Sequence, residues 1–356
     1  MVTYLNTRDI IGDAATLDGL VDHTLLEFTE TNISELYRFA FYNNDQISII
    51  VLPNLTKITN QAFTLCESLQ KLYVGLEKAS VCLLSSVSAL DKTGRCLFIV
   101  PQDLVNDYRS ATNWSVFANR IYYDGDPNMP QWDETEITDT DQELFARINN
   151  NTAASYYKMG QYKTVSFGSF GNARMQIIGI NKDELSDETG YAQLTWFPMD
   201  LLNGLSHRMN PDMINNTEGT GALGGWDKSE MKSYLYNDVW PLIPSGWRDV
   251  IKSVKKYTNG CDVSGNNVSN VLTGEKIWLL SQRELGGTGY ETMGPIYDFT
   301  FYKDASRIRS VGADAQYWWT RTSYSQVYFR TVTSRGTISN ASNSSSFNFA
   351  PFGFCT

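Results

Sequence analysis

The sequence predicts an α+β protein built from two units, a short repeat solenoid followed by a mixed domain of strands and helices. In the first third of the chain, apolar residues recur at a spacing of 22 residues. From about residue 155 onward, short runs rich in β-branched and aromatic residues predict strands, and two amphipathic segments between them predict helices. Strands and helices in such an irregular order are typical of the α+β class. The length of 356 residues agrees with two to three domains.

Composition excludes several classes of function. The formal net charge is −10, and a surface this acidic repels phosphate backbones, so we expect no nucleic-acid partner. The two histidines, His23 and His207, lie far apart in sequence, which disfavours zinc enzymes and most catalysis by a Ser/His or Cys/His pair. The five cysteines form no CxxC motif. We therefore expect a protein that is not an enzyme and needs no metal or cofactor.

The start of the chain indicates where the protein is made. It lacks the basic region and the continuous apolar run of a signal peptide. No stretch approaches the roughly 20 apolar residues of a membrane span. We expect no membrane insertion, and synthesis in a cytoplasm without export by the ordinary route. Residues 1–20 are interpreted as an N-terminal arm.

The repeat in the first third is defined by apolar positions that match in one register. A period of 20 to 29 residues with fixed apolar positions is typical of a leucine-rich solenoid, in which each turn contributes one short strand, here 47–52. After Leu72 the register decays, because Leu84-Ser85 stands where an Ala-Phe pair is expected. A chance apolar rhythm is the alternative, and six matches in one register argue against it. The matched positions are Leu25 with Ile47 and Leu69, Phe28 with Ile50 and Leu72, Ile33 with Leu55, Leu36 with Ile58, and Ala40-Phe41 with Ala62-Phe63.

Two segments of this region also carry a family resemblance. They are LPNLTKITNQAFTLCESLQKLYVG (52–75) and FIVPQDLVNDYRSATNWSVFANRI (98–121). The first resembles the surface-antigen (BspA-like) leucine-rich repeat and the second its C-terminal cap, so that we assign residues 21–122 to a capped solenoid. That family occurs in bacterial surface proteins and phage proteins. The resemblance implies an extracellular interaction module without chemistry.

Residues 123–154 are rich in acidic side chains around a proline-containing stretch. A calcium site is one interpretation. The spacing fits no EF-hand loop, however, and the glycine of such a loop is missing. We interpret the segment as a solvated acidic linker.

Residues 155–356 form the predicted mixed domain. The strand-like runs are 162–167, 174–180, 193–197, 276–281, 317–322 and 327–333. One helix is expected to begin at an N-cap Asp227, to place Met231, Leu235 and Val239 on one face, and to stop at Pro241. A second is expected to begin at an N-cap Ser245, with an apolar face formed by Trp247, Val250, Ile251 and Val254.

Three features of this domain invite a chemical interpretation that we do not favour. Gly219, Gly221 and Gly224 match GxGxxG, but the polar, turn-like segment before them is no buried strand, so a loop leading into a helix is expected. Cys261 and Cys355 have no basic neighbour in sequence that would lower the pKa of a nucleophilic thiol. His207 lies in a loop, where a lone histidine is usually polar surface.

The C-terminal segment 317–356 is the best candidate for a binding surface. It contains no Asp, Glu or Lys, and it mixes aromatic residues with Arg, Asn and Ser. Aromatic side chains supply rigid apolar contact area, while Ser and Asn supply adaptable hydrogen bonds, and this mixture also suits sugar rings. In a regular strand over YWWTRT, only one of the two tryptophans would point into the core. The predicted ligand-binding residues are Trp318, Trp319, Arg321, Tyr324, Tyr328, Arg330, Asn340, Asn343 and Asn348.

The same domain carries a second resemblance, in segments 160–185, 224–244, 276–284, 317–323 and 350–355. Their order is similar to that of a C-terminal domain of unknown function in phage and gut-bacterial proteins, which resembles the C-type-lectin-like fold of formylglycine-generating enzymes and phage tropism determinants. The cysteine pair of the enzymes and the calcium–sugar motifs of true C-type lectins have no convincing match, so neither activity is carried over. In the tropism determinants the variable residues lie in the stretch that corresponds to 318–354. The resemblance thus implies a recognition face there.

Two extracellular-type modules without a signal peptide are reconciled by a phage virion protein, made in the host cytoplasm and exposed after lysis. We therefore expect a receptor-binding or adhesion protein of a tail or head fibre, whose C-terminal domain binds a host-surface glycan or protein. Other virion proteins and further copies of the chain, as a trimer, are the remaining expected partners. The alternatives are a structural virion component such as a decoration or baseplate protein, a bacterial surface adhesin, and a formylglycine-type or other hydrolytic enzyme.

Overall fold

The computed structural model describes residues 10–11 and 25–356, apart from 45, 91–92, 94, 131, 213–216, 265, 288–290, 298–299 and 302–303. The chain divides into two compact units, Met1–Met129 and Pro130–Thr356. Each has its own hydrophobic core. The predicted N-terminal arm, residues 1–20, lies outside the described residues except for strand β1 (Ile10–Ile11).

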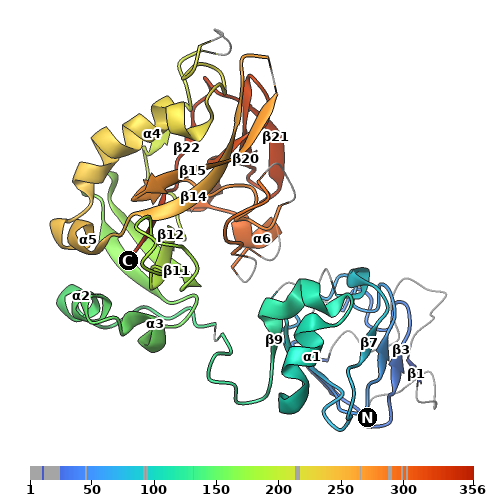
Figure 1. Cartoon of the computed structure of the whole chain (residues 1–356). Coiled ribbons are helices and arrows are strands. Elements are labelled where there is room, and N and C mark those ends of the chain that lie inside the picture. Colours follow the sequence, from blue (N-terminus) through green and yellow to red (C-terminus); the bar gives the residue numbers. More distant parts are fainter. Residues whose placement is uncertain are drawn as a thin grey trace. The chain divides into compact units, whose positions relative to one another are not determined.

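The first unit contains two sheets of parallel strands that follow one another along the chain (Figure 1). In the larger sheet Glu27 pairs with Ile49, and Ile49 pairs with Lys71, so successive strands are offset by the predicted 22 residues. The strand predicted at 47–52 corresponds to β4. The larger sheet has the order β2 (Glu27–Thr29), β4 (Ile49–Leu52), β6 (Lys71–Val74), β8 (Leu97–Ile99) and β9 (Ile121–Tyr122), and the smaller β1, β3 (Glu35–Leu36), β5 (Lys57–Ile58) and β7 (Leu83–Leu84).

The core of this unit forms between successive turns of the chain. On β4 and β6 every second side chain is buried, as a strand with one face toward the core requires. Phe41 and Phe63, matched positions of the repeat, stack with their ring centroids 5.1 Å apart. The Phe41 N–H donates to Ala62 O in the next turn. Each turn therefore buries its apolar side chains mainly against its neighbours.

The repeat does not decay after Leu72 as the sequence indicated. The Phe63 N–H donates to Ala89 O, which reproduces the bond between Phe41 and Ala62 one turn further on. Ala89 and Leu90 are both buried, so they fill the Ala-Phe position that the sequence comparison placed at Leu84-Ser85. An insertion in this turn displaces the register, and the helix η1 (Val87–Ala89) accommodates it.

Short helices follow the last long strand of the first unit, where the sequence indicates a strand and helical turns. They are η2 (Gln102–Leu104), α1 (Val105–Ser110) and η3 (Trp114–Arg120). The Trp114 indole donates to Cys82 O at 2.7 Å, and the Cys82 N–H donates to the Tyr108 hydroxyl at 2.9 Å. These bonds and the burial of both rings fix the helices on the final turn.

The second unit is built around two five-stranded sheets (Figure 1). The first has the order β10 (Tyr162–Ser166), β11 (Asn172–Ile180), β12 (Leu194–Pro198), β23 (Gly353–Cys355), β16 (Ile277–Trp278). The second has the order β13 (Ser206–His207), β22 (Asn348–Phe349), β19 (Trp318–Ser323), β20 (Tyr328–Val332), β21 (Ile338–Asn343). A hairpin of β14 (Val254–Cys261) and β15 (Asn267–Glu275), and a small one of β17 (Ser310–Val311) and β18 (Asp314–Ala315), complete the described strands.

The helices of the second unit differ from the predicted ones at their starts. Ser229, and not Asp227, is the N-cap of α4, because its side chain accepts from Lys232 N–H. The predicted apolar face of Met231, Leu235 and Val239 is buried. The helix predicted from Ser245 ends at Val250, so Val254 lies on β14. The remaining helical segments are η4 (Gly168–Phe170), η5 (Trp226–Lys228), α4 (Glu230–Tyr234), η6 (Leu235–Val239), η7 (Trp240–Leu242), α5 (Ser245–Val250) and α6 (Asp304–Arg307).

Part of the predicted acidic linker, residues 123–154, belongs to the second unit. Helices α2 (Asp141–Asn149) and α3 (Ala153–Tyr156) form there. A capping box between Thr140 and Glu143 starts α2, and its Leu144 and Ile148 enter the core of the second unit. The acidic residues mislead here, because they serve as a helix start and as a partner of Arg147, bound by Asp139 at 2.8 Å.

Stability of the first unit is expected to depend on its repeated core positions. Leu72→Ala, at a fully buried position of β6, should lower the free energy of unfolding of that unit by about 2–5 kcal/mol. Leu26→Ala is the matched control, because Leu26 is 63% exposed, and its effect should stay within about 0.5 kcal/mol. Urea unfolding of the full chain, followed by circular dichroism, compares the two variants. Equal losses would contradict the described packing.

Candidate ligand-binding surface

The structure divides the predicted ligand-binding residues into buried and accessible groups. Trp318, Trp319 and Arg321 are buried, as is the whole of β19. That strand lies in the middle of its sheet and both of its faces are covered, with a register irregularity between Trp319 and Ser323. The expectation that only one tryptophan points into the core is wrong, and these three residues form no exposed binding surface.

Each of the three buried side chains instead has a structural partner. The Trp318 ring packs on Phe197, with 5.7 Å between ring centroids. The Trp319 indole donates to His207 O at 2.8 Å. Arg321 pairs with Glu284 in the interior. Trp319 therefore contributes to the surface indirectly, by fixing the backbone of β13.

Tyr324, Tyr328, Arg330 and Asn343 form a second group, which we call the tyrosine turn. It lies where β19 turns into β20, and Tyr328 pairs with Asn343 across β20 and β21. The Arg330 guanidinium, itself largely buried, stands 4.3 Å from the centroid of the Tyr324 ring. The two tyrosines are half-buried, so part of each ring is accessible. The side chain of Asn340 lies outside the described residues.

His207, Tyr234 and Phe347 form a third group, the aromatic cluster, which the sequence did not single out. The His207 ring stacks on the Tyr234 ring, with centroids 4.1 Å apart, and lies 5.9 Å from the Phe347 ring. Phe347 is 64% exposed, the most exposed of the described large hydrophobic residues. The predicted residue Asn348 adjoins it and pairs with His207 across β13 and β22.

Charged and polar groups border the aromatic cluster and hold it in place. Glu230 accepts from the Arg208 guanidinium at 3.1 Å and lies 3.5 Å from His207 Nε2. The backbone N–H of Glu230 donates to the side chain of Asn210 at 2.8 Å. An exposed aromatic ring beside a carboxylate and a guanidinium offers both apolar contact and hydrogen bonds to a ligand.

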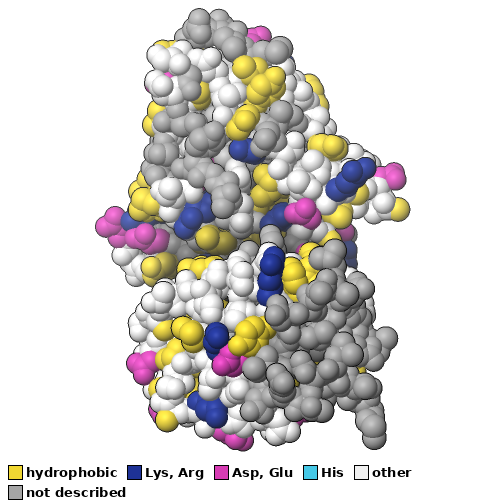
Figure 2. Space-filling model, turned by 90° about the vertical axis from the view of Figure 1, so that its right-hand side faces the viewer, with side chains coloured by type: hydrophobic (Ala, Val, Ile, Leu, Met, Phe, Trp, Pro, Cys, Tyr) yellow, Lys and Arg dark blue, Asp and Glu magenta, His cyan; other side chains and the backbone are white. Residues whose placement is uncertain are grey.

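The two groups are joined by the segment that leads from β21 to β22. Ser346 N–H donates to Asn343 O, and Ser344 N–H donates to Val327 O in the tyrosine turn. At the other end, the Met209 N–H donates to Ser344 O next to β13. On the face of the second unit that carries β21, the coloured side chains are mainly hydrophobic or uncharged polar (Figure 2).

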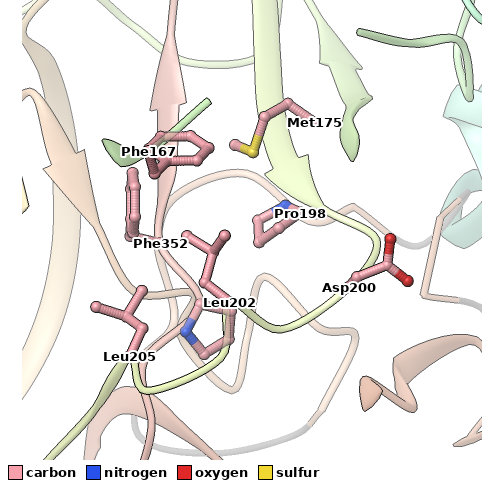
Figure 3. Close-up of a pocket in the computed structure, with 8 residues that line it drawn as sticks. Phe167, Met175, Pro198, Asp200, Leu202, Leu205 and Phe352 are labelled. Atoms are coloured by element: carbon pink, nitrogen blue, oxygen red, sulfur yellow. The ribbon is translucent and has the colours of Figure 1, made fainter. Parts of the chain in front are cut away.

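The best-formed cavity of the described residues lies elsewhere and does not suit a ligand. Its volume is about 10 Å³, enough for a single water molecule. The lining is apolar except for Asp200, which lies at the edge and pairs with Arg174 (Figure 3). Recognition by this unit would therefore use a surface and not a pocket. The lining residues are Phe167, Met175, Pro198, Asp200, Leu202, Leu205, Pro351 and Phe352.

The remaining chemical motifs have structural roles. Gly219, Gly221 and Gly224 all adopt positive φ, as a loop before a helix requires. Cys261 and Cys355 are free and buried, and burial raises the pKa of both thiols. Among the described residues, no group of three or more His, Cys, Asp or Glu is arranged to hold a metal ion. None of the helices in the described ranges has the length and hydropathy of a membrane span.

Trp319→Phe tests the support of the aromatic cluster. Loss of the indole donor to His207 O should cost about 1 kcal/mol and should speed amide exchange in β13. Tyr317→Phe, at a 46% exposed neighbouring position, is the control and should stay within about 0.5 kcal/mol. Hydrogen exchange and urea unfolding measure both effects. Unchanged exchange in β13 of Trp319→Phe would contradict the assigned role.

Comparisons with known proteins give one family match. A family model described as a domain of unknown function (DUF6273) matches residues 212–350. No curated protein and no solved structure matches the chain. The matched segment contains the whole tyrosine turn together with Tyr234 and Phe347. Residues 212–350 are thus similar to DUF6273, a family whose description assigns no activity.

Proposed function

We propose that the second unit is a recognition module that binds a host-surface glycan or protein through the aromatic cluster and the tyrosine turn. The observation that carries this proposal is the exposure of Phe347 beside the stacked rings of His207 and Tyr234. A large apolar ring held open to solvent raises the free energy of the unbound protein. Binding would remove it from water.

The surroundings of Phe347 favour a ligand with both apolar and polar edges. A sugar ring presents C–H groups to an aromatic face and hydroxyls to neighbouring donors and acceptors. Glu230, Arg208 and the Ser345–Ser346 segment supply such groups next to the ring. The backbone of β13 is anchored by Trp319, so little conformational entropy is lost on binding.

We further propose that this module belongs to a phage virion, as part of a tail or head fibre exposed after lysis. The sequence resemblances support this, and the leucine-rich-repeat and C-type-lectin-like identities remain part of the proposal. Individual contacts of such a surface are weak, and several copies on one fibre multiply them by effective concentration. The first unit would serve as a spacer or as a second adhesion surface.

Phe347→Ala should weaken binding of the full chain to host cells or to an array glycan by about tenfold or more, because an aromatic anchor in an interface often contributes ~2 kcal/mol. Tyr191→Ala is the matched control, since Tyr191 is 59% exposed in the same unit but lies outside the aromatic cluster. Its binding should equal that of the unaltered chain. Thermal unfolding of both variants checks that folding is intact.

Two results would oppose the proposal. Equal binding by Phe347→Ala and the unaltered chain would show that the surface is misplaced. A chain that binds no host cell, with the aromatic cluster buried against a neighbouring subunit in the particle, would favour a structural virion component.

A further inference from the structure

The interior of the second unit holds an amine in contact with two carboxylates. Lys256 on β14 is fully buried, and its Nζ lies 2.5 Å from Asp183 Oδ1 and 2.9 Å from Glu284 Oε1. Asp183 is also fully buried, and Glu284 is 2% exposed at its side chain. The hydroxyl of Tyr297 lies 3.1 Å from the same Nζ. Water is therefore excluded from a site where amine and carboxyl groups touch.

Aromatic and charged neighbours complete this site. Lys256 Nζ lies 3.5 Å from the centroid of the Trp278 ring. Glu284 binds Arg321 through its second oxygen at 2.5 Å. The four charged side chains thus balance as two acids and two bases. Burying two ion pairs carries a desolvation penalty that their mutual attraction must offset.

The two oxygens of Asp183 are held differently. Oδ2 accepts from the Thr195 hydroxyl at 2.5 Å and from the Tyr297 hydroxyl at 2.7 Å. Oδ1 faces the lysine amine. Donors fixed on one oxygen would stabilise negative charge developing there if a nucleophile attacked the carboxyl carbon.

We propose that Lys256 and Asp183 condense to an intramolecular amide cross-link, with Glu284 as the catalytic proton carrier. The reacting groups are already in contact, which removes the entropic barrier of bringing them together. The product is neutral, so the desolvation penalty of the Lys256–Asp183 ion pair disappears. Glu284 and Arg321 remain as one matched pair.

The step balances as a dehydration. Burial opposes charge on both groups, but their attraction keeps the pKa of Asp183 below and that of Lys256 above its ordinary value, so the pair starts ionised. A proton passes from Nζ to Oδ1, the Nζ lone pair forms a bond to Cγ, and the C=O electron pair moves onto Oδ2. Glu284 accepts the second Nζ proton and passes it to Oδ1. The Cγ–Oδ1 bond then breaks, water leaves, and the carbonyl re-forms.

Glu284 has the properties that this role requires. It contacts the nucleophilic nitrogen directly. Burial opposes its charge, but Arg321 and Lys256 hold its pKa below the ordinary range, so it begins as a carboxylate. The cross-link would join the segment after β11 to β14, 73 residues apart in sequence. It would raise the resistance of the domain to unfolding, which an exposed fibre protein needs.

Mass spectrometry of the purified full chain tests the proposal. The denatured protein should weigh one water molecule less than its sequence, and digestion should release a branched peptide that joins Lys256 to Asp183. Glu284→Gln should lower the cross-linked fraction at least about tenfold, as the loss of a general acid–base does. Lys256→Arg should abolish it.

Lys255→Arg is the matched control. Lys255 also contacts two carboxylates, Glu184 at 2.7 Å and Glu188 at 2.8 Å, but these groups are more exposed to solvent. This variant should keep the full mass deficit. Recovery of Lys256 in an unmodified linear peptide from the unaltered chain would overturn the proposal, whether or not any variant folds. So would a mass deficit that persists in Lys256→Arg, because it would indicate a succinimide at an aspartate.

Discussion

The contact between Lys256 and its two carboxylates is the constraint on which the second unit depends. Four segments meet there: the loop after β11 with Asp183, the strand β14, the turn after β16 with Glu284, and β19 with Arg321. A buried charge without a partner costs several kcal/mol, so displacement of any one segment exposes the others to that penalty. The network therefore fixes β19 in the interior. Its tryptophans are buried as a consequence.

Burial of β19 decides where recognition can occur. The strand supplies support, while the accessible side chains lie on the turns at its end and on the neighbouring β13 and β22. Tyr324 stands at one such turn, and Phe347 stands just before β22. A rigid sheet that carries exposed aromatic residues on its connections combines a fixed backbone with freedom to vary the contacting side chains.

Local patterns in the sequence predicted more of the structure than of the candidate site. The repeat of the first unit and the buried face of Met231, Leu235 and Val239 follow from apolar spacing, which depends on near neighbours in the chain. The displaced turn at Ala89-Leu90 was missed because an insertion breaks the period while the contacts continue. The burial of both Trp318 and Trp319 was missed because covering both faces of a strand is a tertiary effect. The aromatic cluster joins His207, Tyr234 and Phe347 from three distant segments, and no spacing in the sequence connects them.

The most direct measurement of recognition by this surface is hydrogen exchange of the full chain with and without a host-cell glycan that it binds on an array. Exchange should slow in three segments, around His207, Tyr234 and 343–349, and should stay unchanged in the parallel strands of the first unit. Protection confined to the first unit, or absent from all three segments, would contradict the assignment of the binding surface.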